Sequence, residues 1–216
     1  MPAVVLQIGG RIRAERARRG ISLRSLARSV GLSPSLISQI ETGKCQPSVS
    51  TLYAITTALG ISVQDVFGES GSAASGQDPA PGPPQPELPE PEPGPAADGG
   101  WPGGSVGCPG QREILELDSG VTWERLGHAP GSQVDFLLVS YAPGGCSSPA
   151  GHLMQHPGTE YGYLLQGELV VTLGPGAHRL SPGDSVSFTS ATPHSYRNEG
   201  TVPAVGVWFV VGPDGT

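Results

Sequence analysis

Residues 22–44 have the sequence SLRSLARSVGLSPSLISQIETGK, which predicts two short helices joined by a tight turn. Ser22 and Ser33 are residues that cap helix N-termini, and Pro34 stands at a first helical position, where proline costs no hydrogen bond. Gly31 can close the first helix in the left-handed conformation. The buried faces expected from apolar spacing are Leu23, Leu26, Ala27 and Val30 in the first helix, and Leu36, Ile37 and Ile40 in the second.

The second of these helices presents small polar side chains and one amide away from its apolar face. Such side chains suit the base edges of the DNA major groove, where Gln39 can form a bidentate pair with adenine. Residues at helix ends and in the following loop are expected to contact phosphates. We predict a DNA-binding surface formed by Ser22, Arg24, Ser33, Ser35, Ser38, Gln39, Thr42 and Lys44. Capping is the main role expected of Ser22 and Ser33, and a solvated surface position is the alternative for Gln39.

Further helices are expected on both sides of this pair, over residues 8–19, 47–59 and 62–67. The first of them carries a cluster of arginines on its outer face, and this cluster is expected to add sequence-independent affinity for DNA. The alternative is that these arginines form only a solvated surface. These arginines are Arg11, Arg13, Arg16, Arg18 and Arg19. Glu41, by contrast, is expected to be a structural acid and not a DNA contact.

Residues 8–67 resemble the Cro/Xre-type helix-turn-helix domain, above all over the stretch LSPSLISQIETGKCQPSVSTLYAITTALGIS. The capping residues, the turn and the apolar spacing of this stretch all agree with the pattern of that family. The resemblance implies an all-α, lambda-repressor-like domain, which we assign to residues 6–68. It also implies binding to an operator in double-stranded DNA.

Charge is divided unevenly along the chain. Residues 1–67 contain eight Lys or Arg and three acids, which gives a net charge of +5. Residues 68–216 contain four Lys or Arg and sixteen acids, which gives a net charge of −12. A basic head on an acidic body is typical of a DNA-binding module attached to a different kind of domain. The three cysteines lack metal-binding or paired spacing, and there is neither a leader nor a membrane-spanning run. We therefore expect a cytoplasmic protein without membrane partners.

Residues 69–110 differ in composition from both flanks. They contain eleven Pro, ten Gly and six acids, and no Lys or Arg. A segment with so little apolar content cannot bury enough surface to offset its ordering entropy. We predict a disordered linker, with a docking motif for a proline-reading partner as the alternative.

From residue 112 the hydrophobic period changes to two, which predicts strands. The expected strands cover residues 112–117, 121–126, 134–141, 161–166, 168–173, 185–188, 195–198 and 204–211. Eight short strands in about 100 residues are typical of a small all-β barrel or jelly roll. The C-terminal part is therefore predicted to be a β domain, which we assign to residues 111–213.

Two motifs in this part resemble those of the cupin family. His156-x3-Glu160-x6-Gly167 resembles the first cupin motif, and Pro182-Gly183-Asp184 followed by Pro193-His194-x3-Asn198 resembles the second. The resemblance implies a cupin domain, a double-stranded β-helix or jelly roll.

In metal-binding cupins the ligands are two His, one Glu and a later His. Here His156, Glu160 and His194 take three of these positions, and Met154 stands at the first His position. A thioether is a poor ligand for hard or borderline metals. We expect a metal-free pocket formed by His156, Glu160, His194 and Tyr163 that recognises a small polar or cationic molecule. Binding of Fe, Mn or Zn by the three matching residues is the alternative.

Together these features predict a one-component transcriptional regulator and not an enzyme. The cupin domain is expected to bind a small-molecule effector and to form a homodimer, because one helix-turn-helix makes few base contacts. A long linker cannot transmit a rigid rotation from the cupin domain to the DNA-binding domain. The effector is therefore expected to alter the dimer, or to change the fraction of time that both DNA-binding domains occupy DNA together. The alternative is a metal-dependent cupin dioxygenase or isomerase that carries a DNA-binding head.

Overall fold

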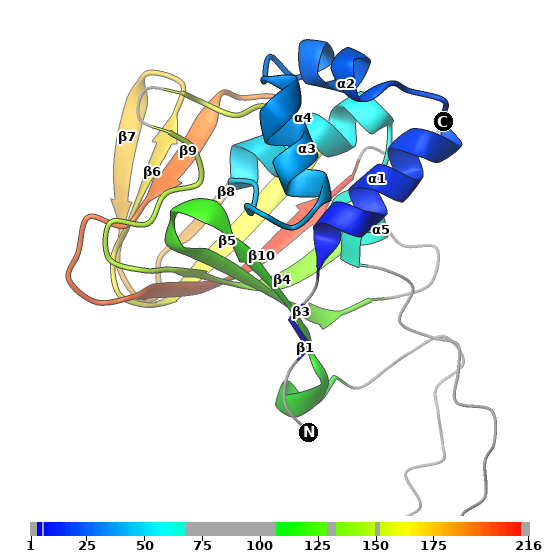
Figure 1. The fold of residues 1–216 in the computed structure, drawn as a ribbon. Helices are drawn as coiled ribbons and strands as arrows, with labels where there is room; N and C mark the ends of the chain where they lie inside the picture. Colours follow the sequence, from blue (N-terminus) through cyan, green and yellow to red (C-terminus); the bar gives the residue numbers. More distant parts are fainter. Residues whose placement is uncertain (1–3, 6, 68–106, 129–132, 150–151, 213–216) are drawn as a thin grey trace, which may run out of the picture.

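The structure is a computed structural model, and it describes residues 4–5, 7–67, 107–128, 133–149 and 152–212 (Figure 1). The helices of the N-terminal part are α1 (Ile8–Arg18), α2 (Leu23–Ser29), α3 (Pro34–Glu41), α4 (Val49–Leu59) and α5 (Val63–Phe67). Their positions confirm the predicted helical fold. Most of the predicted linker, residues 69–110, lies outside the described residues. No described helix is long and apolar enough to cross a membrane.

Local sequence explains where these helices begin and how closely they pack. The side chains of Ser22 and Ser33 accept hydrogen bonds from the backbone N–H groups of Ser25 and Leu36, so both serines cap as predicted. Gly9 lets α1 approach α3, because a Cβ there would lie 2.0 Å from the carbonyl oxygen of Ile40. The result is a helical core whose apolar side chains, such as Ile12, are buried.

The C-terminal part is a β domain, as predicted, and its strands form two sheets. Its strands are β2 (Glu113–Leu117), β3 (Val121–Gly127), β4 (Val134–Tyr141), β5 (Thr159–Gln166), β6 (Leu169–Leu173), β7 (Gly176–Leu180), β8 (Ser185–Thr189), β9 (His194–Arg197) and β10 (Ala204–Val211). The larger sheet has the order β1-β2-β3-β4-β10-β5-β8 and the smaller one β7-β6-β9. Neither β7 nor the short β1 (Val4–Val5), which pairs in parallel with β2, is among the sequence predictions.

The helical part packs directly on the larger sheet (Figure 1). The backbone N–H of Asp118 donates to the carbonyl of Pro47 at 3.0 Å, and that of Ser50 donates to the carbonyl of Ser147 at 2.9 Å. In addition, the guanidinium of Arg125 lies 5.4 Å from the ring centroid of Phe67. This contact is not among the sequence predictions, which considered a linker as the connection between the two parts.

Candidate functional site

The predicted DNA-binding residues lie on α2, on α3 and in the segments at the ends of these helices. Gln39, Ser35, Arg24 and Lys44 are exposed, and Ser38 is half-buried. The Thr42 hydroxyl donates to the Ser38 carbonyl at 2.8 Å, so it also closes the end of α3. Most of these side chains are therefore accessible to solvent, while α4 and α5 face the strands.

The arginines of α1 do not form one free basic face. Arg16 forms a bidentate ion pair with Glu41, at 2.5 Å from Nε to Oε1 and 2.8 Å from Nη2 to Oε2. Arg18 and Arg19 both bond Glu15. Glu41 is buried, which agrees with its expected structural role, and Arg16 ties α1 to α3. The prediction that Arg16 belongs to an exposed basic face is therefore wrong.

A buried triad of His156, Glu160 and His194 lies inside the cupin domain. Glu160 is on β5 and His194 begins β9, while His156 precedes β5. The Oε1 atom of Glu160 is 2.9 Å from Nε2 of His156 and 3.0 Å from Nε2 of His194. The exposed fractions of the three residues are only 6%, 2% and 0% in chain order. The two cupin motifs thus bring their matching residues together.

Hydrogen bonds fix which ring nitrogens face the triad. Nδ1 of His156 lies 3.2 Å from the carbonyl oxygen of Pro157, and Nδ1 of His194 lies 2.8 Å from that of Thr192. A carbonyl only accepts, so each Nδ1 carries a proton and each Nε2 presents a lone pair to the triad when the ring is neutral. Among the described residues, these Nε2 atoms and Oε1 of Glu160 have no hydrogen-bond partner of suitable geometry.

The carboxylate of Glu160 is held in its ionised form. Burial raises the pKa of this group, but hydrogen bonds and positive charge from the imidazoles of His156 and His194, when their Nε2 atoms are protonated, more than offset that effect and lower the pKa to about 2. Its other oxygen, Oε2, accepts a hydrogen bond from the Tyr196 hydroxyl at 2.6 Å, and Trp208 Nε1 donates to that hydroxyl at 3.2 Å. These bonds fix the carboxylate orientation.

This donor set fits a divalent metal. Three unpaired ligand atoms lie within 4.8 Å of one another, and two imidazoles with one carboxylate are suitable ligands for Fe, Mn or Zn. The Nδ1–carbonyl hydrogen bonds are the outer-shell contacts that metal-binding histidines make. A metal held by His156, Glu160 and His194 would act there as a Lewis acid. Met154, at the first His position of the family motif, is buried and its backbone pairs with that of His194.

Tyr53, on α4 of the helical part, closes the triad from outside. Its ring stacks on the imidazole of His156, with centroids 3.8 Å apart and planes inclined by 2°. It also makes an edge contact with Trp123, at 5.9 Å between centroids. A cavity in the barrel interior, among Tyr53, Glu160 and Trp208, has a volume of about 20 Å³, which is room for about one water molecule. Tyr53 is not among the predicted site residues.

The prediction that Tyr163 lines this pocket is wrong. Side chains alternate along β5, so Glu160, Gly162 and Leu164 point inward while Tyr163 points outward. Tyr163 is 47% exposed on the outer surface. The inward position beside it is Gly162, where a Cβ would lie 2.5 Å from the ring of Trp208. Trp208 therefore fills the space that an inward tyrosine would need.

Comparison with known families agrees with both parts of this architecture. The helix-turn-helix family matches residues 12–66, and the cupin domain family matches residues 137–210. The chain is a helix-turn-helix protein with a cupin domain. It is 28% identical over 192 residues to the HTH-type transcriptional regulator PuuR of Escherichia coli K12, covering 88% of this chain and 86% of that protein.

Two further proteins are similar to this helix-turn-helix cupin protein, one over part of the chain and one over nearly all of it. The immunity repressor protein of Bacillus phage phi105 is 41% identical over 64 residues, which are 30% of this chain and 44% of the repressor. The crystal structure of an HTH_3 family transcriptional regulator from Vibrio cholerae has a TM-score of 0.61 and 22% identity, and covers 96% of each chain. The latter likeness shows the fold of the chain.

Proposed function

We propose that this protein is a transcriptional regulator that binds operator DNA through α3, as a homodimer, and that a small-molecule effector controls it. The observation that carries this proposal is the exposed polar surface of α3 in a capped helix-turn-helix frame. Gln39 reads base edges, whereas Arg24 and Lys44 contact phosphates. The named regulators among the relatives support this function. Two copies on a pseudo-palindrome supply the base contacts that a single domain lacks.

A DNA-binding assay tests this function. Fluorescence anisotropy with duplexes taken from the gene's own upstream region should show one that binds at least a hundredfold more tightly than random competitor. The variant Gln39→Ala should bind that duplex about 5- to 150-fold more weakly, which corresponds to the 1–3 kcal/mol of one bidentate contact. Equal affinity of the wild-type protein for all duplexes would refute the proposal.

The cupin triad serves regulation and not turnover in this proposal. An enzyme of this fold needs room for a substrate beside its metal, and here Tyr53 and the interior aromatic side chains leave about 20 Å³. A divalent metal held by His156, Glu160 and His194 would instead fix the imidazole on which Tyr53 stacks. Metal analysis of the purified protein should give about one Fe, Mn or Zn per chain, lost in His194→Ala. Metal-free wild-type protein that cannot be loaded with Zn²⁺ or Mn²⁺ would contradict this role.

A further inference from the structure

The outer face of the larger sheet is apolar at its centre. Side chains alternate along β4, β10 and β5, and those of the inner set, such as Glu160, point toward the smaller sheet and the helical part. An antiparallel sheet with one packed face ordinarily presents polar side chains on the other. Here ten of the twelve outward positions on these three strands are Val, Leu, Phe or Tyr, and only Ser140 and Thr159 are polar.

The exposed side chains of this face form a continuous patch. Tyr161 is 50% exposed, Tyr163 47% and Leu165 49% on β5, and Phe209 of β10 is 38% exposed. They are four of the six large apolar side chains that are exposed in the described part of the chain. Phe209 lies opposite Tyr161 in the sheet, and its ring stacks on that of Phe136 of β4 at 4.5 Å between centroids. Exposed apolar patches of this kind mark interaction surfaces.

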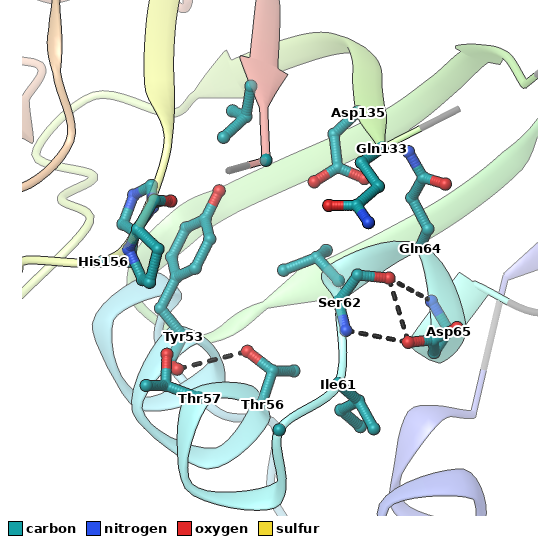
Figure 2. Close-up of a pocket in the computed structure, with 15 residues that line it drawn as sticks. Tyr53, Thr56, Thr57, Ile61, Ser62, Gln64, Asp65, Gln133, Asp135 and His156 are labelled. Atoms are coloured by element: carbon teal, nitrogen blue, oxygen red, sulfur yellow. Dashed lines mark hydrogen bonds between the residues drawn. The ribbon is translucent and has the colours of Figure 1, made fainter. Parts of the chain in front are cut away.

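The patch carries no charge. The structure describes β4, β5 and β10 in full, and the only charged residues in these three strands are Asp135 and Glu160, both of which are buried on the inner side. Figure 2 shows Asp135 on the side of the sheet that faces α4 and α5, beside the cleft that Tyr53 lines. No charge on the outer face of these strands therefore has to be desolvated when another surface covers it.

Polar groups surround the patch instead. On one side the outward residues of β8 are Ser185 and Ser187, which lie opposite Tyr163 and Tyr161. On the other side Glu124 of β3 lies opposite Leu138 of β4 and forms an ion pair with Arg112 at 2.9 Å. An uncharged apolar centre inside a polar rim is the arrangement found in protein–protein interfaces.

The size of the face suits a stable dimer. The three central strands have eight residues each, and the face also includes the neighbouring β3 and β8. Five strands ~25 Å long and ~4.8 Å apart cover on the order of 600 Å². This area is close to the ~800 Å² that each partner buries in an interface of standard size.

Charge favours a second copy of the chain as the occupant. Residues 68–216 have a net charge of −12, so two copies repel one another unless they meet through an uncharged face. The chain's own residues 79–95 are the competing occupant, because Pro-rich segments bind aromatic surfaces. That segment contains three Glu and no Lys or Arg, and the centre of the face has no cation to pair with them.

We propose that this outer face binds the same face of a second copy, with the two larger sheets packed against each other. Such a contact is isologous, so each side chain of the patch is used twice. The inference rests on the proposed function, since it assigns a surface to the homodimer that two half-sites require. The helical part lies on the inner side of the sheet, and both DNA-binding surfaces therefore stay outside this interface.

Sedimentation velocity of the full-length protein over a concentration series tests the assignment. The wild type should be a dimer, and Tyr163→Glu should weaken the dimer at least a hundredfold, because it places an unpaired charge from each copy in the contact. Tyr161→Glu repeats the test at a neighbouring position. His178→Glu, which adds the same charge on the exposed strand β7 of the smaller sheet, is the matched control and should stay dimeric. Circular dichroism verifies that each variant is folded.

Hydroxyl-radical labelling of the wild type gives a second readout that needs no variant. Labelling of Tyr161 and Tyr163 should fall at least threefold between concentrations at which the protein is monomeric and dimeric. Leu153 is 40% exposed outside the patch, and its labelling should stay the same. The same measurement on a variant that lacks residues 75–105 asks whether the chain's own linker covers the face.

Three results would overturn the assignment. They are a wild-type protein that is monomeric throughout the series, a Tyr163→Glu variant that dimerises as tightly as the wild type, and labelling of Tyr161 that rises when residues 75–105 are removed. DNA binding is measured on the same preparations. Sequence-specific binding together with any of these results refutes the assigned face and leaves DNA recognition standing. A dimer that forms through this face but binds all duplexes equally refutes the proposed function alone.

Discussion

The ring of Tyr53 lies flat on the imidazole of His156, at 3.8 Å between centroids, and this stack joins the DNA-binding part to the cupin triad. Tyr53 belongs to α4, which packs on α1 and α2, while His156 faces Glu160 through its Nε2 atom. Any change in the orientation of His156 therefore acts on the helix that supports the DNA-binding surface. The two parts are coupled through a direct contact as well as through the chain between them.

Replacing Tyr53 by alanine should loosen this docking. The variant loses a buried aromatic side chain and its stack, a change that typically costs about 3–5 kcal/mol in a core. Hydrogen exchange measured by mass spectrometry should become faster in α4 and in residues 134–141. Tyr53→Phe keeps the ring and serves as the control. Equal exchange in the two variants would mean that the stack does not hold the parts together.

Metal affinity at the triad should fall as the pH falls. Both Nε2 atoms must be unprotonated to bind a metal, so protons compete with the ion. A titration with Co²⁺, followed by its visible absorption, should show much tighter binding at pH 8 than at pH 5.5. Glu160→Gln should weaken binding at both pH values, whereas Tyr163→Phe, on the outer surface, should bind as the wild type does. A pH-independent affinity would contradict binding by the two imidazoles.

The buried carboxylate of Asp135 should make the protein less stable at high pH. Its pKa is raised from 3.8 to about 7 in the folded chain, so the folded state binds a proton that the unfolded state releases. Its contribution is therefore favourable near pH 4, is lost as the pH rises to 7 and stays lost above that. Asp135→Asn should raise the unfolding free energy at pH 8, by at most about 4 kcal/mol, and change it little near pH 4.

Urea denaturation of wild type and variant at pH 5 and pH 8 measures this effect. Glu116→Gln, an exposed acid on β2, is the control and should show no such difference between the two pH values. A destabilised Asp135→Asn at pH 8 would contradict a net cost of burying the Asp135 carboxylate. It would indicate instead that the favourable charge of Arg125 outweighs the cost of burial.

The ion pair between Arg16 and Glu41 should be needed for the fold of the helical part. Glu41 is buried, so Glu41→Gln leaves Arg16 without its charged partner, which typically costs about 3–5 kcal/mol. Thermal unfolding followed by circular dichroism at 222 nm reports mainly on the helices. Glu15→Gln, which removes the half-buried partner of Arg18 and Arg19 at the protein surface, should change the melting temperature little. Similar shifts in both variants would exclude a special role for the buried pair.

Local patterns in the sequence predict the elements well. Capping serines and apolar spacing place the helices, and period-two segments place most of the strands. The strand β7 (Gly176–Leu180) is missing from the predictions because its side chains are mostly exposed and Ala177, His178 and Arg179 lack the apolar alternation of a buried strand. The triad follows from motifs whose spacing is conspicuous in the sequence.

The contact between the two parts is harder to predict because it depends on long-range packing. In α4 the side chains of Leu52, Ile55 and Leu59 form the stripe that is buried in the helical core. Tyr53 lies next to this stripe in the sequence, so it is easily taken for one more residue of that core. A second stripe at helical spacing, Val49, Tyr53 and Thr56, is the signal that points to another packing partner. Asp135 offers no such signal, since an acid in an alternating strand is ordinarily exposed.

Selection of DNA sites from a random pool, followed by sequencing, tests the central claim most directly. The full-length wild-type protein should enrich one sequence, in two half-sites related by a pseudo-dyad, and Gln39→Ala should lose or change the preference at one position of each half-site. Arg24→Ala should instead weaken binding to all sequences and lower its salt dependence. Recovery of a random pool by the folded wild-type protein, or identical motifs for wild type and Gln39→Ala, would contradict recognition of DNA by α3.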